Sequence, residues 1–200
     1  EHGPYIALQL VEAPTLRERL GEGELPLLEA LRIAADVGRT LQAAHDARVV
    51  HGDLKPENIF LLPGGRTKLA DFGAAVFLDE RSGTARTRVR LGTPPYMAPE
   101  QIAQRAIDGR TDVYGLGCVL HEMLTGDVPF GRVDAPAELL RRQLESLPPR
   151  LPTPSFPSEV QRLLDRCLAK ERADRHVSAE AFARAAERLA DGLVHDAERG

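Results

Sequence analysis

The stretch from His51 to Phe60 brings a carboxylate, an ammonium group and a carboxamide together within a few positions of one another. Asp53 can accept a proton, Lys55 can neutralise negative charge on a phosphoryl group, and Asn58 can bind a hard cation through its carbonyl oxygen. Apolar pairs precede and follow these residues, at 49–50 and 59–60. The pattern predicts a polar loop that lies between buried segments and binds a charged ligand.

A second acidic group follows this loop in a position that should bring it close. Residues 59–62 and 67–70 are short strand-like runs on either side of the turn Pro63-Gly64-Gly65, which predicts a β-hairpin. Asp71, in the tripeptide Asp71-Phe72-Gly73, comes directly after the second strand. Because the two strands of a hairpin are antiparallel, the loop before the first strand and Asp71 after the second should be neighbours.

The motifs occur in the order that protein kinases use. The kinase signature is H-R-D-L-x-x-x-N, then D-F-G, then A-P-E, and this chain has His51-Gly-Asp-Leu with Asn58, then Asp71-Phe-Gly, then Ala98-Pro-Glu100. The chain therefore resembles a bacterial-type (eukaryotic-like) serine/threonine protein kinase. The fold implied is mainly α, the C-terminal helical lobe of the α+β kinase fold with short β-hairpins, and the N-terminal β lobe is absent from this sequence.

The resemblance implies a role for each polar residue of the loop. Asp53 and Lys55 would be catalytic, and Asn58 and Asp71 would hold the metal. The cofactors would be ATP and Mg²⁺ or Mn²⁺, and the reaction would transfer the γ-phosphoryl group to serine or threonine hydroxyls of protein substrates. His51 would pack against Phe72 and take no part in catalysis.

Residues 4–11 are apolar and predict a short buried strand, which in the kinase resemblance is the hinge between two lobes. Leu8 would be the gatekeeper. The nucleotide would contact the backbone between Gln9 and Val11, the region of Thr15 near the ribose, and Phe60 beneath the adenine. Thr15 also predicts the N-cap of a short helix.

The segment from 71 to 100 corresponds to a kinase activation segment. Its middle is polar, and Ser82, Thr84 and Thr87 are possible phosphorylation sites near the arginines at 86, 88 and 90. Thr93 would hydrogen-bond to both Asp53 and Lys55, as in serine/threonine kinases.

Two buried charged groups should support this segment and the loop. Glu100 would form an ion pair with Arg175. Asp112, at the start of an apolar run that reaches Leu124, would cap a helix, hold the backbone of the catalytic loop, or do both.

Helical periodicity extends through most of the remaining chain. Apolar residues recur at helical spacing over 25–47, 113–124, 135–145, 158–169 and 178–193. The resemblance then divides the chain into a hinge and first helix over 1–20, a kinase C-terminal lobe over 21–193 with catalytic loop 51–58 and activation segment 71–100, and a tail over 194–200.

The sequence also departs from the kinase pattern. No G-x-G-x-x-G and no V-A-I-K precede the hinge, so we expect this chain to be part of a longer domain and to bind ATP poorly by itself. Gly52 stands where the signature has arginine. Small-molecule kinases of the aminoglycoside and choline type share H-G-D-x-x-x-x-N, so a small-molecule phosphotransferase is one alternative, although they typically lack Lys55 and the segment ending at Glu100. A pseudokinase that binds partners without chemistry is the other.

Composition narrows the class of partner. The net charge is −4, with 42% hydrophobic and 28% charged residues, which gives no basic surface for nucleic acid. Cys118 and Cys167 lie in apolar helical patterns and predict two buried, reduced thiols, which fits a cytoplasmic location. No run of 18 apolar residues occurs, so we expect no membrane segment within the chain.

Overall fold

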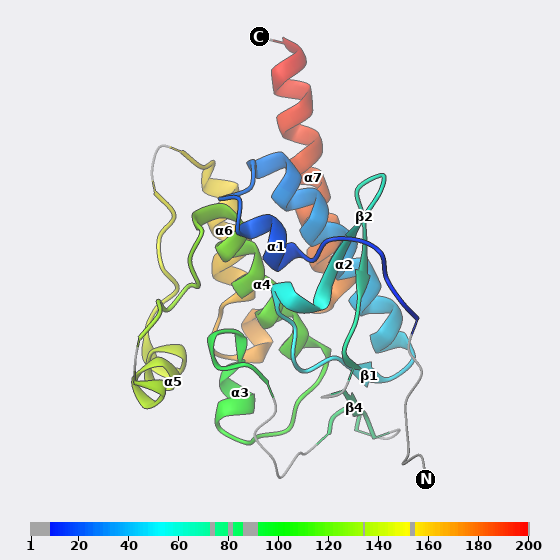
Figure 1. Ribbon diagram of the computed structural model, residues 1–200. Coiled ribbons are helices and arrows are strands. Elements are labelled where there is room, and N and C mark those ends of the chain that lie inside the picture. The colour runs from blue at the N-terminus through cyan, green and yellow to red at the C-terminus, as the bar shows by residue number, and fades with distance from the viewer. Residues whose placement is uncertain are drawn as a thin grey trace.

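The computed structural model describes residues 9–72, 75–79, 82–85, 92–133, 135–152 and 155–199. Over these residues the fold is mainly helical, with two small sheets (Figure 1). The helices are α1 (Leu16–Leu20), α2 (Leu27–Asp46), α3 (Pro99–Ile102), α4 (Gly109–Thr125), α5 (Pro136–Glu145), α6 (Ser158–Cys167) and α7 (Ala179–Arg199), with 3-10 turns η1 (Pro56–Asn58), η3 (Pro94–Tyr96) and η4 (Arg172–Asp174). The strands are β1 (Val49–Val50), β2 (Ile59–Leu62), β3 (Arg66–Leu69) and β4 (Val76–Phe77).

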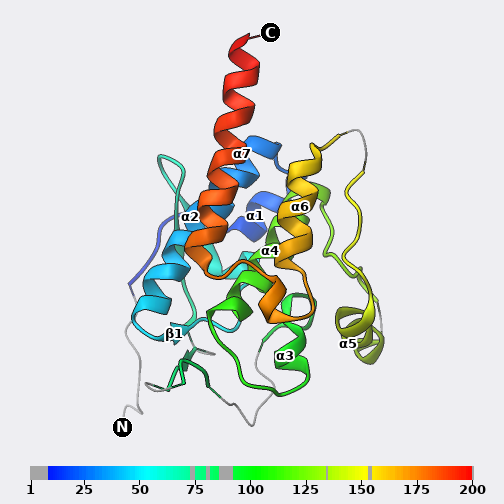
Figure 2. The ribbon, with the colours of Figure 1, turned by 180° about the vertical axis from the view of Figure 1, so that it is seen from behind.

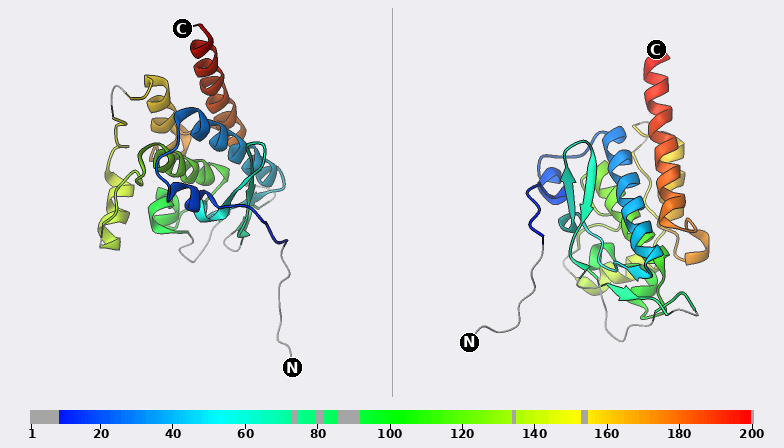
Figure 3. Two further views of the ribbon diagram at one scale, coloured as in Figure 1. Left: turned by 45° about the horizontal axis from the view of Figure 1, so that its top comes forward. Right: turned by 90° about the vertical axis from the view of Figure 1, so that its right-hand side faces the viewer.

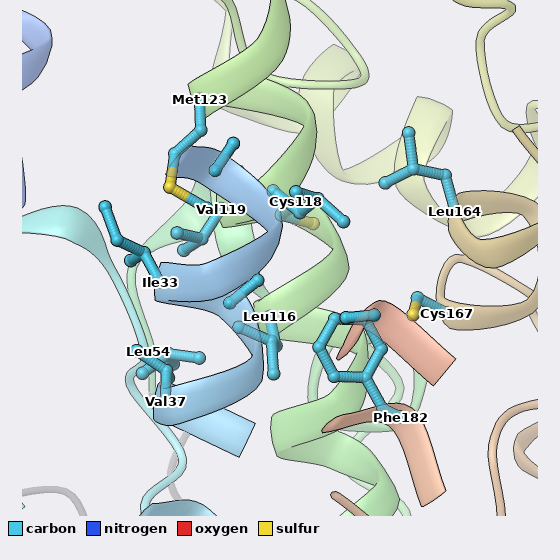
Figure 4. Packing of buried hydrophobic residues seen from close by; sticks show 14 of the residues in the cluster. Ile33, Val37, Leu54, Leu116, Cys118, Val119, Met123, Leu164, Cys167 and Phe182 are labelled. Atoms are coloured by element: carbon cyan, nitrogen blue, oxygen red, sulfur yellow. The ribbon is translucent and has the colours of Figure 1, made fainter. Parts of the chain in front are cut away.

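Helix α4 is the centre of the core. All of its residues from Thr111 to Leu124 are buried, and a helix that is buried on every side must be covered by other elements. Figure 4 shows side chains of α2, α4, α6 and α7 meeting around it. Cys118 and Cys167 lie in this core as free, buried thiols, as predicted. Helix α4 ends at Gly126, whose left-handed φ of 73° suits a residue without a Cβ.

Helices α2 and α7 run side by side, and both contact α4 (Figure 2). Small residues allow the close approach: a Cβ on Gly38 would lie 3.1 Å from both the Ala179 carbonyl oxygen and the Ala183 Cβ. Helix α7 extends beyond the rest of the molecule at the C-terminal end (Figure 3). We predicted that this helix ends at Leu193, but it continues to Arg199, since no Gly or Pro follows Leu193 before that residue.

The predicted β-hairpin is confirmed. Strands β2 and β3 pair antiparallel from Ile59–Leu69 to Leu62–Arg66. The second small sheet joins β1 to β4, with Val50 opposite Val76. Together the two sheets bring the loop after β1 and the residues after β3 to one edge of the helical core.

Two expectations were wrong. Residues 9–11 form no strand, and the side chain of Leu10 is 79% exposed, because no other described segment pairs with this backbone. Asp112 does not cap α4; the cap is Asp108, whose side chain accepts a hydrogen bond from the Arg110 amide at 2.9 Å. Among the described residues, no helix has the length and apolar character needed to cross a bilayer.

Gly117 should be required for α4 to pack against α6. A Cβ at this position would lie 2.5 Å from the Cys167 Cβ and 3.2 Å from Leu168 Cδ2. Gly117→Ala should therefore lower the free energy of unfolding by about 1–3 kcal/mol, because the overpacked helices must move apart.

Gly192→Ala is the matched control, because a Cβ on this exposed residue of α7 would meet nothing within 4 Å. It should raise the free energy of unfolding by up to about 1 kcal/mol through helix propensity. Urea titration measures both variants, and equal stabilities would contradict the close packing of α4 on α6.

Candidate active site

The loop after β1 is held by the buried carboxylate of Asp112, which is 2% exposed. Its Oδ2 accepts hydrogen bonds from the His51 amide at 2.9 Å and from His45 Nε2 at 2.8 Å. Its Oδ1 accepts one from the Gly52 amide at 2.8 Å. The second predicted role of Asp112, holding the loop backbone, is therefore confirmed.

Gly52 adopts a conformation that favours glycine. Its φ is 74°, in the left-handed region where a Cβ is strained. Its amide is bound by Asp112, and its carbonyl oxygen accepts a hydrogen bond from Gln101 Nε2 at 2.7 Å. The N–H and C=O groups of Gly52 are thus both hydrogen-bonded, although Gly52 itself has no side chain.

Asp53, Lys55 and Thr93 form one hydrogen-bonded group, as predicted. Lys55 Nζ lies 2.8 Å from Asp53 Oδ2 and donates to Thr93 Oγ1 at 3.1 Å. The Thr93 amide and hydroxyl both donate to Asp53 Oδ1, at 2.6 and 2.7 Å. Partial burial raises the pKa of Asp53, but the hydrogen bonds from Lys55 and Thr93 outweigh it and hold the pKa below its usual value. The carboxylate is therefore ionised at neutral pH and can accept a proton.

Asn58 and Asp71 lie on adjoining backbone. The Asn58 carbonyl oxygen accepts a hydrogen bond from the amide of Ala70, the residue before Asp71. Asn58 Nδ2 donates to the Asp53 carbonyl oxygen at 3.0 Å, which orients its side chain beside the loop. Asp71 is exposed and has a left-handed φ of 59°, which aspartate tolerates better than most residues.

This donor set suits a hard cation, because carboxylate and amide oxygens are the ligands that Mg²⁺ and Mn²⁺ prefer. The hydrogen bond from Nδ2 leaves the amide oxygen of Asn58 as the atom suited to a metal. Among the described residues, no group of three or more His, Cys, Asp or Glu side chains is arranged for a metal ion. A cation here would therefore depend on Asn58, Asp71 and oxygen atoms of its ligand or of water.

His51 occupies the structural role that we predicted. Its ring centroid lies 4.7 Å from that of Phe72. Its Nε2 lies 3.1 Å from the Ala70 carbonyl oxygen, and its Nδ1 accepts from the Asp53 amide at 3.3 Å. Both ring nitrogens are thus used to join the loop to the segment after β3.

Of the residues predicted to contact a nucleotide, Gln9 and Thr15 both contact the hairpin that carries Phe60. Thr15 caps α1 through a capping box with Glu18, and its backbone forms a β-bridge with Phe60. The side chain of Gln9 contacts Lys68, the residue opposite Phe60 in the hairpin. Val11 is half-buried in the segment between Gln9 and Thr15. Leu8 lies outside the described residues.

The described part of the activation segment contains a compact turn. The Ser82 hydroxyl donates to Asp79 Oδ1 at 3.1 Å, and the Thr84 hydroxyl donates to Ser82 Oγ at 3.2 Å. Ser82 is exposed, and Thr84 is half-buried. Thr87, like the arginines at 86, 88 and 90, lies outside the described residues.

Glu100 and Arg175 form the predicted buried ion pair, with side chains 4% and 0% exposed. Arg175 Nη1 and Nη2 each lie 2.8 Å from one carboxylate oxygen. Its remaining N–H groups donate to the carbonyl oxygens of Ala169, Arg110 and Lys170, so all five donors are used. The pair fixes the segment 98–102 to the core.

Sequence reasoning missed a second charged cluster, formed by Arg17, Glu57, Tyr96 and Glu122. The Arg17 guanidinium lies 2.8 Å from Glu57 Oε1, 2.9 Å from Glu122 Oε1 and 2.7 Å from the Tyr96 hydroxyl. Burial raises the pKa of Tyr96, and its hydrogen bond to Glu122 at 2.6 Å adds to that effect. The cluster joins α1, η1, η3 and α4. No spacing rule links these four positions, so only the fold could reveal it.

Sequence reasoning also missed how the segment 93–97 is supported from the side of α5. The Gln143 side-chain amide donates to the Pro94 carbonyl oxygen. Lys170 Nζ donates to the Gln143 carbonyl oxygen at 2.6 Å and lies 4.0 Å from the centre of the Phe130 ring. Burial lowers the pKa of Lys170 to about 8. Gln101 belongs to the same support, since its Oε1 accepts a hydrogen bond from the Ala98 amide at 2.9 Å.

Loss of the negative charge at Glu100 should destabilise the whole domain. Glu100→Gln leaves the guanidinium of Arg175 without a counter-charge at a fully buried position. We expect the free energy of unfolding to fall by about 3–5 kcal/mol.

Glu180→Gln removes the partner of Arg184 from an exposed pair and serves as the control. It should change the free energy of unfolding by less than about 1 kcal/mol. Denaturant titration of both variants measures the difference, and a similar small loss in each would contradict the anchoring role of Glu100.

Comparison with known proteins agrees with this geometry. Residues 2–185 match the family model for the protein kinase domain. The chain is 35% identical over 184 residues to serine/threonine-protein kinase Pkn1 of Myxococcus xanthus, an alignment that covers 90% of the chain and 26% of Pkn1.

Two further relatives show the same relationship. Serine/threonine-protein kinase PkaB of Streptomyces coelicolor is 39% identical over 193 residues, 92% of the chain and 45% of PkaB. Serine/threonine-protein kinase PknL of Mycobacterium tuberculosis is 36% identical over 194 residues, 96% of the chain and 48% of PknL. The chain thus spans between a quarter and a half of the length of these relatives. A mainly helical fold, the kinase motifs in order and a match over residues 2–185 lead to one conclusion: the chain belongs to the protein kinase domain family.

Proposed function

We propose that this chain is part of a serine/threonine protein kinase that transfers the γ-phosphoryl group of ATP to serine or threonine hydroxyls of proteins. The observation that carries the proposal is the contact of the Asp53 carboxylate with both Lys55 and Thr93. The names of the relatives, each a serine/threonine-protein kinase, support the same reaction.

In this proposal Asp53 orients the substrate hydroxyl and accepts its proton. The hydroxyl oxygen forms a bond to the γ-phosphorus while the bond between that phosphorus and the bridging oxygen of ADP breaks. The lowered pKa of Asp53 keeps it deprotonated before transfer. Lys55 stabilises negative charge on the transferring group, and its existing contact with Asp53 supports that placement.

Asn58 and Asp71 are the residues that would hold Mg²⁺ or Mn²⁺. A bound divalent ion would neutralise charge on the phosphate oxygens. The residues of this chain contribute the orientation: Asn58 is fixed by its hydrogen bond to the Asp53 carbonyl oxygen, and Asp71 by its position directly after Ala70.

The nucleotide would lie on the face formed by Gln9, Val11, Thr15 and Phe60. The β-bridge between Thr15 and Phe60 supports this placement, because it brings the segment that follows the predicted hinge next to the hairpin. The other side of the site, from Thr93 to Glu100, would bind the polypeptide substrate.

Phosphorylation of the activation segment and the location of the protein belong to the same proposal. Phosphorylation at Ser82, Thr84 or Thr87 would modify the activation segment, and the exposure of Ser82 supports access to it. The location would be cytoplasmic.

A small-molecule phosphotransferase is disfavoured, because Lys55 and the segment ending at Glu100 are both engaged in the site.

Removal of the proton acceptor should abolish transfer. Asp53→Asn in the complete kinase domain should lower kcat by several orders of magnitude, since the amide cannot accept the proton. The measurement is transfer from γ-³²P-ATP to a generic protein, with aminoglycosides and choline offered in parallel.

Asp127→Asn, at an exposed carboxylate paired with Arg132, is the control and should retain full activity. Normal transfer by the Asp53 variant would refute the catalytic assignment. Label found only on a small molecule would replace the protein kinase proposal with the phosphotransferase one.

The acidic limb of the pH–rate profile should report the environment of Asp53. Thr93→Val removes one hydrogen bond to the ionised carboxylate but keeps the one from the backbone amide. The pKa of Asp53 should therefore rise, and the fall of kcat/KM on acidification should begin at a higher pH than in the unmodified enzyme. An unchanged acidic limb would show that Asp53 does not control it.

A further inference from the structure

A pocket of about 400 Å³ lies between α6 and the beginning of α7, formed by residues that have no part in the candidate active site. Its wall includes three arginines and a histidine. The lining residues are Arg166, His176, Ser178, Glu180, Ala181, Arg184, Ala185 and Arg188.

Two of the arginines have no anionic partner within the described chain. Arg184 is paired with Glu180 at 2.7 Å, but neither Arg166 nor Arg188 forms a hydrogen bond or ion pair with any described residue. Both are exposed at the pocket wall. With one carboxylate and three guanidinium groups, the pocket carries an excess of positive charge.

The pocket also contains a buried histidine, His176, with an unsatisfied ring nitrogen. Its side chain is 5% exposed, and its Nε2 is one of three buried side-chain polar atoms without a partner among the described residues. The ring is hydrogen-bonded to the Leu163 backbone and packs edge-on against Phe182, with centroids 5.7 Å apart. A buried polar atom without a partner costs free energy, so a ligand that satisfies it would be stabilised.

The charges around His176 point to the kind of ligand. Burial, together with the positive charges of Arg166 and Arg188, lowers the pKa of His176 to about 4. The charged groups facing it are Arg166 from α6 and Glu180, Arg184 and Arg188 from α7. An anion between the two unpaired arginines would neutralise them and, at the same time, favour a proton on Nε2.

We propose that this pocket binds the phosphate group of a phosphorylated serine or threonine in a polypeptide. Arg166 and Arg188 bind the phosphate oxygens through charge-assisted hydrogen bonds, and Nε2 of His176 shares a proton with one of them. The phosphate monoester suits this arrangement because its second pKa is about 6, so it can carry that proton near neutral pH.

The size of the pocket favours a phosphorylated side chain over a free ion. One water accounts for about 30 Å³ of liquid, so a pocket of about 400 Å³ has room for a phosphate and the residue that carries it. The choice of a phosphopeptide as the ligand rests on the proposed kinase activity, which produces phosphorylated side chains. The proposal that the pocket binds phosphate does not depend on that activity.

The test is isothermal titration calorimetry on the full chain without nucleotide. The probe is an acetylated and amidated pentapeptide with one phosphothreonine, and the comparison ligands are the unphosphorylated peptide, inorganic phosphate and inorganic sulfate. Because the phosphopeptide is synthetic, failure of the binding proposal is separate from failure of the kinase proposal.

We expect the phosphopeptide to bind more tightly than inorganic phosphate, and the unphosphorylated peptide and sulfate not to bind measurably. Binding at pH 7.5 should take up protons, seen as a dependence of the enthalpy on the ionisation enthalpy of the buffer. Arg166→Gln combined with Arg188→Gln should weaken binding by at least about tenfold, because two charge-assisted contacts are lost.

Arg141→Gln combined with Arg162→Gln removes the same net charge from exposed arginines outside the pocket and should change the affinity less than about twofold. Equal weakening by both double variants would overturn the proposal, since it would indicate attraction to overall charge. Absence of phosphopeptide binding at millimolar concentration would also overturn it, as would equal affinity for inorganic phosphate.

Discussion

The carboxylate of Asp112 is the constraint on which the candidate active site depends. It lies on a helix whose surroundings are apolar, and a charge buried there is tolerated only if hydrogen bonds satisfy it. The loop supplies two of those hydrogen bonds through the amides of His51 and Gly52, and His45 on α2 supplies the third. The core therefore fixes the loop backbone. Asp53 is positioned because it directly follows His51 and Gly52, which cannot move without leaving the buried carboxylate of Asp112 short of hydrogen bonds.

The same logic extends outward from α4. Arg175 lies over the ring of Tyr114 on α4, with 4.9 Å between guanidinium carbon and ring centre, and all of its donors are satisfied. By pairing with Glu100, Arg175 fixes the segment that contains Thr93 and so holds Thr93 in contact with Asp53. Gln101 then joins this segment to the Gly52 carbonyl oxygen. The loop and the segment are thus tied both to the core and to each other, which preorganises the group formed by Asp53, Lys55 and Thr93.

Charged side chains divide between two uses in this molecule. Where they are buried or half-buried they form hydrogen-bonded groups, as in the Arg17, Tyr96 and Glu122 cluster, and these join elements far apart in the chain. Where they remain partly unpaired, as around His176, a charged ligand gains from binding. Since desolvation is costly for any unpaired charge, the first use stabilises the fold and the second provides recognition. The pocket near His176 lies on α6 and α7, outside the elements that carry the catalytic motifs.

The sequence by itself determined the elements and the identity of the polar groups, because these depend on local pattern. Helical periodicity predicted α2 and α4 to α7, the Pro63–Gly65 turn predicted the hairpin, and the antiparallel hairpin predicted that Asp71 lies near the loop that carries Asp53 and Asn58. The tertiary structure decided the contacts for which the sequence held neither a local pattern nor a family motif. Asp108 rather than Asp112 caps α4, Arg17 reaches Glu122, and the Nε2 atom of His176 is left without a partner among the described residues. These outcomes depend on how buried helices pack against one another, and the packing of side chains from distant segments has no periodic signature in the chain.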